Sequence, residues 1–248
     1  MDILQMLLLA GLGVVAGILN VLAGGGSLMT LPVLIFMGLP APVANGTNRI
    51  AILCQNIVAV GGFKSKGVFP AKLALLCTVP ALIGSIIGAQ LAIDISEELF
   101  KQILAAVMIG VIILMVFDPN KRLKVDEQHM TPLRTAMLLF SFFLIGIYGG
   151  FIQAGVGFLI MSGLLVHGLD LVKINAVKVF VVLFYTIIAM AVFIWHDQVN
   201  YPLGIALAVG NSAGGWIGSH LAVKKGHDWI KRLVIIVVVI FAIKLVWF

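Results

Sequence analysis

One glycine-containing pattern occurs twice in this sequence, about 130 residues apart. The first copy begins at Ala23-Gly24-Gly25-Gly26 and the second at Ala154-Gly155-Val156-Gly157, and each continues into an apolar run. Each copy then reaches an asparagine, Asn45 in the first and Asn175 in the second. The chain is therefore predicted to be one unit written twice. Duplicated, glycine-interrupted hydrophobic units are typical of transporters that bind substrate near the middle of the bilayer.

Composition places both copies in a membrane. Of the 248 residues, 62% are hydrophobic and only 10% are charged, and the mean hydropathy is +1.18. Apolar runs of roughly 20 residues, long enough to span a bilayer, recur from one end to the other. We expect a polytopic membrane protein with a single integral domain over residues 1–248. The first run lacks the basic start and cleavage site of a signal peptide, so we expect it to be retained.

Five apolar segments are predicted in each copy. They cover residues 3–22, 24–37, 44–63, 71–92 and 99–117 in repeat A (3–117), and 133–152, 155–168, 174–195, 202–222 and 229–248 in repeat B (133–248), with a linker at 118–132. The second segment of each copy is short, because about 14 helical residues cover about 21 Å of a hydrocarbon core about 30 Å thick. We predict an all-α polytopic membrane protein of two inverted-topology repeats, each with a Gly-rich broken or re-entrant helix pair plus three spanning helices.

The basic residues predict the opposite orientations of the two repeats. Lys and Arg gather in the loops near 64–72, 121–134 and 224–232, whereas the loops at 94–98 and 196–200 contain neither. Because cytoplasmic loops are enriched in basic residues, we assign the first three loops to the cytoplasm. Equivalent loops of the two copies carry opposite bias, which predicts that the second copy is inserted upside down. Both termini then lie in the periplasm.

The glycine motifs are candidate anion sites. A helix that begins without side chains exposes free backbone N–H groups at the positive end of its dipole, and this arrangement binds anions. The residues that form these two helix starts are Gly24, Gly25, Gly26, Ser27, Gly155 and Gly157, and we expect them to meet near a pseudo-two-fold axis. Close helix packing is the alternative role. Packing is the role we favour for two later motifs, Gly84-Ser85-Ile86-Ile87-Gly88 and Gly214-Gly215-Trp216-Ile217-Gly218.

Two cations fall inside apolar segments. Arg49 lies in the third segment, and Lys178 lies in the eighth at the position that matches Asn48. Charge at such depth is costly and marks functional sites, although long side chains can also reach back to the interface. All ten acidic residues fall in loops or at segment ends, so neither cation has an obvious carboxylate partner. Because a buried unpaired cation is unfavourable, we predict that a bound anion supplies the counter-charge.

Amide side chains complete the predicted substrate site. Asn45 and Asn48 can share a helix face, as can Asn175 and Lys178, and Gln153 precedes the second glycine motif. Amide N–H groups bind oxyanions without carrying charge, and hydrogen bonding between helices is their alternative role. The predicted substrate-binding residues are Gly24, Gly25, Gly26, Ser27, Asn45, Asn48, Arg49, Gln153, Gly155, Gly157, Asn175 and Lys178.

Several function classes find no support in the sequence. It has no HExxH, no Walker loop, no GxSxG and no βαβ setting that would turn its glycines into a dinucleotide motif, so we predict no enzyme activity, no cofactor and no metal site. The net charge of +6 comes mostly from short loops, which fits membrane orientation better than nucleic-acid binding. Cys54 and Cys77 both fall in apolar segments and are interpreted as small buried side chains.

The sequence resembles the TauE/SafE sulfite exporter family over nearly its whole length. The resemblance lies in GILNVLAGGGSLMTL at 17–31, GLP at 38–40, ANGTN at 44–48, GGFIQAGVG at 149–157 and NAVK at 175–178. It implies a bacterial inner-membrane permease for small sulfur-containing anions such as sulfite, sulfoacetate or related sulfonates. Val156 stands where the first motif has Gly25, so the two motifs need not contribute equally.

These observations leave three hypotheses. The first is a secondary transporter or facilitator that exports a small organosulfur anion across the inner membrane, with the bilayer and the anion as its partners and a homo-oligomer possible. The second is an uptake permease for a sulfonate or small carboxylate. The third is a membrane scaffold that transports nothing, which needs neither an inverted duplication nor buried cations.

Overall fold

The computed structural model describes residues 3–117, 131–165 and 170–224, and every element in this part of the chain is a helix. The helices are α1 (Ile3–Ala23), α2 (Ser27–Phe36), α3 (Ala41–Lys64), α4 (Ala71–Ile93), α5 (Glu97–Phe117), α6 (Pro132–Phe151), α7 (Val156–Leu165), α8 (Leu171–Trp195) and α9 (Tyr201–Lys224). The all-α prediction is confirmed for these residues. The predicted segment 229–248 and most of the linker lie outside them.

The helices have the surface of a membrane protein. Four of those described, α1, α4, α6 and α8, are long and apolar enough to cross a bilayer. On α4, Leu75, Val79 and Ile83 are more than half exposed, whereas polar residues of α3 such as Asn45 and Asn56 are buried. Apolar side chains thus cover the outside and amides line the interior, which fits a multi-pass membrane protein.

The start of α8 is fixed by a side chain. The carboxylate of Asp170 accepts hydrogen bonds from the backbone N–H groups of Val172 (3.0 Å) and Lys173 (2.9 Å). Partial burial tends to raise the pKa of this carboxyl, but these bonds and the Lys173 ammonium outweigh it and hold the pKa below its usual value. This cap sets where α8 begins and so places Lys178 about two turns inside the helix.

The two halves of the chain interlock through glycines. In α1, a methyl group on Gly17 would lie 3.0 Å from the Cα of Gly214 in α9. In α6, a methyl group on Gly150 would lie 2.7 Å from the Cα of Ser85 in α4. The first helix of each half therefore packs closely on the fourth helix of the other half, as small residues allow in membranes. The packing role predicted for these later glycine motifs is confirmed.

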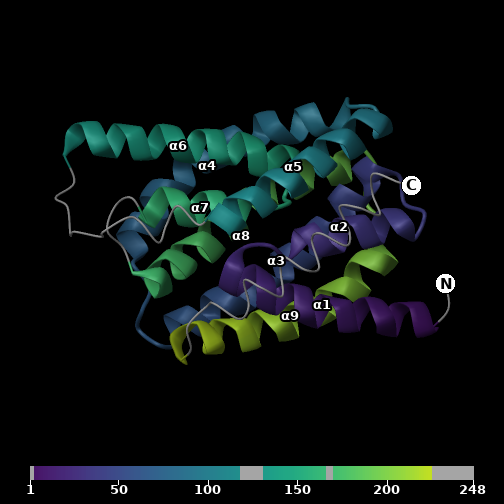
Figure 1. The fold of residues 1–248 in the computed structure, drawn as a ribbon, viewed down its shortest axis with the longest axis horizontal. Helices are drawn as coiled ribbons and strands as arrows, with labels where there is room; N and C mark the ends of the chain where they lie inside the picture. The colour runs from purple at the N-terminus through teal and green to yellow at the C-terminus, as the bar shows by residue number, and fades with distance from the viewer. Residues whose placement is uncertain (1–2, 118–130, 166–169, 225–248) are drawn as a thin grey trace.

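The contacts also give the helix directions. Gly13 of α1 lies beside Leu207 of α9, and Gly17 lies beside Gly214. Residue numbers therefore increase in the same direction along both helices, which makes α1 and α9 parallel. Helices α6 and α4 are parallel for the same reason. Helices α3 and α8 cross in opposite directions, because Gly46 near the start of α3 contacts Phe193 near the end of α8. Figure 1 shows α1 starting at the end of the molecule where the N-terminus lies and α6 starting at the opposite end.

The short helices α2 and α7 return the chain toward the side from which it came. Helix α1 is parallel to α9, and α3 runs in the same direction as both, since Gly204 lies against Thr47 and Gly62 against Ser219. Two consecutive long helices with the same direction require a return between them, and α2 supplies it with ten residues, about 15 Å. Helix α7, also of ten residues, occupies the equivalent place in the second half.

Substitution of an interlocking glycine should destabilise the fold. A methyl group in Gly214→Ala meets the carbonyl of Val14 and the Cα of Gly17, both backbone atoms that cannot move aside. We expect a loss of about 1–3 kcal/mol in the free energy of unfolding, the usual cost of overpacking. The measurement is the thermal unfolding midpoint in detergent. Gly110→Ala is the control, because nothing lies within 4 Å of the added methyl group; equal midpoints for the two variants would contradict the packing.

Candidate anion site where the two glycine corners meet

Each half of the chain turns sharply at one glycine. Gly24 directly follows α1 and has φ +78°, and Gly155 lies in the turn between α6 and α7 and has φ +72°. Glycine adopts this left-handed conformation without the steric cost that other residues have. The two turns, residues 24–26 and 154–157, are called the glycine corners below. Their matching backbone conformation accounts for the repeated motif.

The two glycine corners are in backbone contact with each other. A methyl group on Gly24 would lie 2.5 Å from the Cα of Gly157, and one on Gly157 would overlap the Cα of Gly24. A methyl group on Gly26 would overlap the carbonyl of Ala16 in α1. The predicted meeting of the two motifs is therefore present in the structure, and only glycine permits an approach this close.

The starts of α2 and α7 lie next to the contact between the two glycine corners. In the first corner, the first backbone bonds run from the N–H of Leu28 to the carbonyl of Gly25 (3.1 Å) and from Met29 to Gly26 (3.0 Å). Within the described residues, the N–H groups of Gly25, Gly26 and Ser27 donate to no backbone carbonyl. Free N–H groups and the positive end of the dipole together favour a negative charge at such a place.

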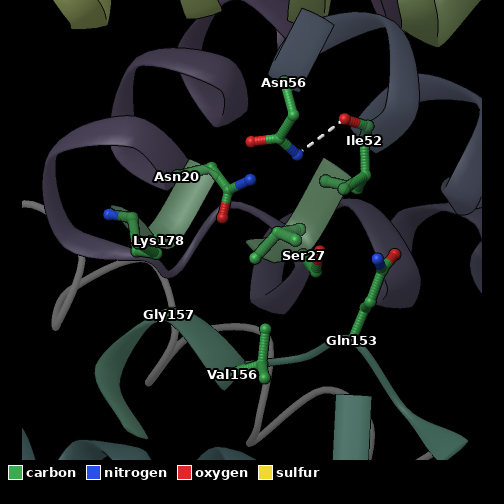
Figure 2. Close-up of a pocket in the computed structure, with 9 residues that line it drawn as sticks. Asn20, Ser27, Ile52, Asn56, Gln153, Val156, Gly157 and Lys178 are labelled. Atoms are coloured by element: carbon green, nitrogen blue, oxygen red, sulfur yellow. Dashed lines mark hydrogen bonds between the residues drawn. The ribbon is translucent and has the colours of Figure 1, made fainter. Parts of the chain in front are cut away.

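A cavity lies beside the corners, lined by both halves of the chain. Its lining residues are Asn20, Ser27, Ile52, Asn56, Gln153, Val156, Gly157, Lys178 and Val182, and Figure 2 shows most of them, labelled, around the cavity. One pair of lining residues, Ile52 and Val182, occupies matched positions of the repeat, 130 residues apart. The cavity therefore lies where the two copies face each other.

Lys178 is the cation of this cavity. Its side chain is 2% exposed, and its ammonium donates to the carbonyl of Val21 (2.7 Å) and to Oδ1 of Asn175 (2.7 Å), with the sulfur of Met161 3.9 Å away. Every Asp and Glu among the described residues is exposed. The charge of Lys178 is thus solvated by neutral dipoles and not cancelled by a carboxylate of this part of the chain.

Hydrogen bonds hold the polar lining in place. The amide of Asn48 donates to the hydroxyl of Ser27 (3.2 Å) and accepts from Thr30 (2.7 Å). On the other side, the amide of Gln153 donates to the hydroxyl of Thr186. Asn48 and Thr186 therefore hold the side chains of Ser27 and Gln153 in place, as a binding site that must keep its shape requires.

The cavity is nearly closed in this conformation. It has about 10 Å³ of space for a water-sized sphere, close to the minimum that holds one water molecule. An oxyanion of four or more heavy atoms needs more room than this. Binding such an ion requires the two corners, or the helices behind them, to move apart.

Some predicted site residues lie elsewhere. Asn45 and Arg49 do not line the cavity; they bind the end of α6, where Asn45 donates to the carbonyl of Phe151 (2.8 Å) and Arg49 donates to the carbonyls of Gly149 (3.2 Å) and Gly150. Asn48 and Asn175 stand behind Ser27 and Lys178. Of the glycines, Gly157 lines the cavity, whereas Gly24, Gly25, Gly26 and Gly155 belong to the corners and are absent from its lining.

Sequence reasoning missed part of the lining. Asn20 and Asn56 were recognisable as polar residues, but nothing in their local spacing distinguished them from ordinary interhelical hydrogen-bonding groups. A signal existed in the repeat itself: Asn48, Ile52 and Asn56 are spaced by four, and so are their counterparts Lys178, Val182 and Thr186. Two matched stripes with i, i+4, i+8 spacing mark the faces that α3 and α8 turn toward each other.

Comparison with known proteins gives the family. The model of the family described as "Sulfite exporter TauE/SafE" matches residues 9–245. The chain belongs to the TauE/SafE sulfite exporter family. The predicted resemblance is thereby confirmed.

Relatives cover nearly the whole chain. A "Probable membrane transporter protein ORF9" of Sinorhizobium sp is 29% identical over 232 residues, covering 93% of this chain and 88% of the relative. A "Probable membrane transporter protein" of Haemophilus influenzae is 25% identical, covering 95% and 92%. The "Probable membrane transporter protein YfcA" of Escherichia coli is 26% identical, covering 94% and 86%. These names indicate a membrane transporter and specify no substrate.

The corner contact should tolerate no side chain. Gly157→Ala places a methyl group against the backbone of Gly24 in the other half, so we expect loss of folded protein or a separation of the corners that lowers the thermal midpoint by several degrees. Size-exclusion profiles and thermal midpoints in detergent measure this. Gly163→Ala in the same short helix is the matched control, since its methyl group meets nothing within 4 Å. A Gly157→Ala protein as stable as the control would refute the contact.

Proposed function

We propose that this protein is a secondary transporter or facilitator that exports a small sulfur-containing anion, such as sulfite, sulfoacetate or a related sulfonate, across the bacterial inner membrane. The observation that carries the proposal is Lys178: a buried cation in the lining of a cavity between the two halves, with every described carboxylate exposed. A cation in this setting attracts an anion strongly, because at an effective dielectric constant near 20 a pair of charges about 4 Å apart gains about 4 kcal/mol.

The donor set supports an oxyanion. Lys178, Asn20 and Asn56 line the cavity together with the starts of α2 and α7. In this closed conformation the Lys178 ammonium donates to Val21 and Asn175, and the Asn56 amide donates to the carbonyl of Ile52 (2.7 Å). Once the cavity opens, donors that belong to several different helices suit a pyramidal or tetrahedral oxyanion such as sulfite or a sulfonate group. A carboxylate can use the same donors, so the preference for sulfur rests on membership of the sulfite exporter family.

We propose that the two halves are inverted-topology repeats that alternate access to this cavity. The opposite directions of α1 and α6, the reciprocal packing of α1 on α9 and α6 on α4, and the matched cavity residues support this proposal. In such transporters, rocking of one repeat against the other exposes a central site to each side in turn. The nearly closed cavity is then an occluded state between the two open ones.

The proposed topology has both termini in the periplasm. The loops at 94–96 and 196–200 follow α4 and α8, two parallel helices, so both emerge at one end of the molecule, while the loop at 65–70 lies at the other end. Basic residues near that last loop assign it to the cytoplasm. An interior-negative potential then pushes anions outward at roughly 2.3 kcal/mol per charge per 100 mV, which favours export.

Cysteine labelling in cells tests the topology. In a Cys54→Ala, Cys77→Ala background, single cysteines at Ser96 and His196 should react with a membrane-impermeant thiol reagent added outside the inner membrane. A cysteine at Ser65 should react only after the membrane is permeabilised. Labelling of Ser96→Cys and His196→Cys from opposite sides would contradict the proposed arrangement.

Binding tests the site. We expect sulfite or sulfoacetate to raise the thermal midpoint of the purified protein. We expect Lys178→Gln to weaken this binding by about 10- to 100-fold, or about 1.4–2.8 kcal/mol, because it removes the one cation among the described residues of the lining. Lys173→Gln is the matched control: Lys173 lies on the same helix but is half-exposed and paired with Asp170. Acetate and succinate are tested in the same way as carboxylate anions.

The outcomes separate the hypotheses. Stabilisation by sulfonates that Lys178→Gln loses and Lys173→Gln keeps supports the proposed site and substrate class. Stabilisation by carboxylates alone would favour the carboxylate permease, and equal loss in both variants would remove Lys178 from the site. In liposomes, efflux of the stabilising anion is expected; binding without flux in either direction would favour a non-transporting role.

A further inference from the structure

The end of α6 has no free carbonyl. The last four carbonyls of a helix have no donor within it and form the negative end of its dipole. In α6, the carbonyl of Tyr148 accepts from the N–H of Ile152 (2.8 Å), those of Gly149 and Gly150 accept from Arg49, and that of Phe151 accepts from Asn45 (2.8 Å). Helix α3 of the other half supplies all but the first of these donors.

Arg49 is a fixed cation at this helix end. Its side chain is 0% exposed, and its guanidinium carbon lies 4.6 Å from the centre of the Phe193 ring in α8. No Asp or Glu among the described residues is buried, so its charge is balanced by the helix dipole and the ring face. A guanidinium cannot be deprotonated in proteins, so this charge stays through any cycle of conformational change.

The end of α1 is held in a related way. The ammonium of Lys178, from α8 of the second half, donates to the carbonyl of Val21 in the last turn of α1. The carbonyls of Leu19 and Asn20 accept from the N–H of Gly24. Each half therefore places one tethered cation on the end of the first helix of the other half.

Helix ends of this kind coordinate the coupling ion in other transporters built from broken helices, where free carbonyls bind Na⁺. We propose that Arg49 and Lys178 occupy, as permanent parts of the protein, the positions that a coupling cation takes in such transporters. The inference rests on the proposed function and adds that transport of the anion is not coupled to Na⁺. Without a coupling Na⁺, the membrane potential acts directly on the charge of the anion and can drive its export.

Flux in proteoliposomes tests the proposal on the wild-type protein. Vesicles are loaded with sulfite or sulfoacetate, whichever binds, in sodium, potassium or N-methylglucamine salt of equal ionic strength, with the membrane potential set by an ionophore. We expect efflux rates that agree within twofold among the three cations and increase when the interior is made negative. A saturable increase of tenfold or more with Na⁺ would overturn the proposal.

Thermal stability tests the cation site without flux. The wild-type midpoint should be equal in sodium and N-methylglucamine chloride, because its helix ends are filled. Arg49→Gln should have a lower midpoint, since it leaves the carbonyls of Gly149 and Gly150 unpaired, and Arg49→Lys, which keeps a charge, should recover part of the loss. Arg134→Gln, at the other end of the same helix, is the control and should unfold as the wild type does.

The flux and thermal measurements distinguish failure of the proposed function from failure of the inference about Na⁺. Absence of anion flux in all three salts would contradict the proposed function. The thermal measurement would still decide whether the protein binds Na⁺. Stabilisation of the wild type by Na⁺ but not by N-methylglucamine would show an alkali-cation site and overturn the inference even where anion flux is present. Equal midpoints for wild type and Arg49→Gln would also overturn it, because the guanidinium would then contribute nothing at the end of α6.

Discussion

The contact between Gly24 and Gly157 is the constraint on which the rest of the structure depends. Two chain turns touch backbone to backbone in the interior of an apolar protein, where every exposed N–H and carbonyl must find a partner. That requirement explains the polar residues around the corners: Asn45 and Arg49 satisfy the end of α6, Lys178 satisfies the end of α1, and Asn48 orders the start of α2. The donors left over at the two helix starts form the candidate anion site.

The two copies of the unit are matched in backbone and differ in charge. Position 48 in the first half corresponds to position 178 in the second, and the first holds Asn where the second holds Lys. Two lysines facing each other across the corners would repel, because like charges in a buried site disfavour each other. One cation and one amide keep the helix crossing intact and leave a single positive charge for a small anion. The cavity is therefore asymmetric although the fold around it is reciprocal.

Much of this could be predicted from the sequence, and the remainder has a geometric reason. The repeat, the short segments and the meeting of the glycine motifs followed from spacing and apolar length alone. Arg49 is a predicted substrate-binding residue that does not line the cavity in this conformation. It lies one residue beyond the position that matches Lys178, and one residue turns a helix by about 100°, which directs its side chain to α6. Which face of α3 meets which neighbour depends on helix packing, and the sequence of a single helix does not contain that information.

The central claim is that a small oxyanion binds where the two glycine corners meet. Anomalous diffraction from crystals grown with selenite, a heavier analogue of sulfite, tests it most directly. We predict a selenium peak between Lys178 and the start of α2 or α7, with the selenite oxygens within hydrogen-bonding distance of both and with the corners further apart than in the closed cavity. A peak only at surface lysines, or none in crystals of a protein that transports sulfite, would contradict the account.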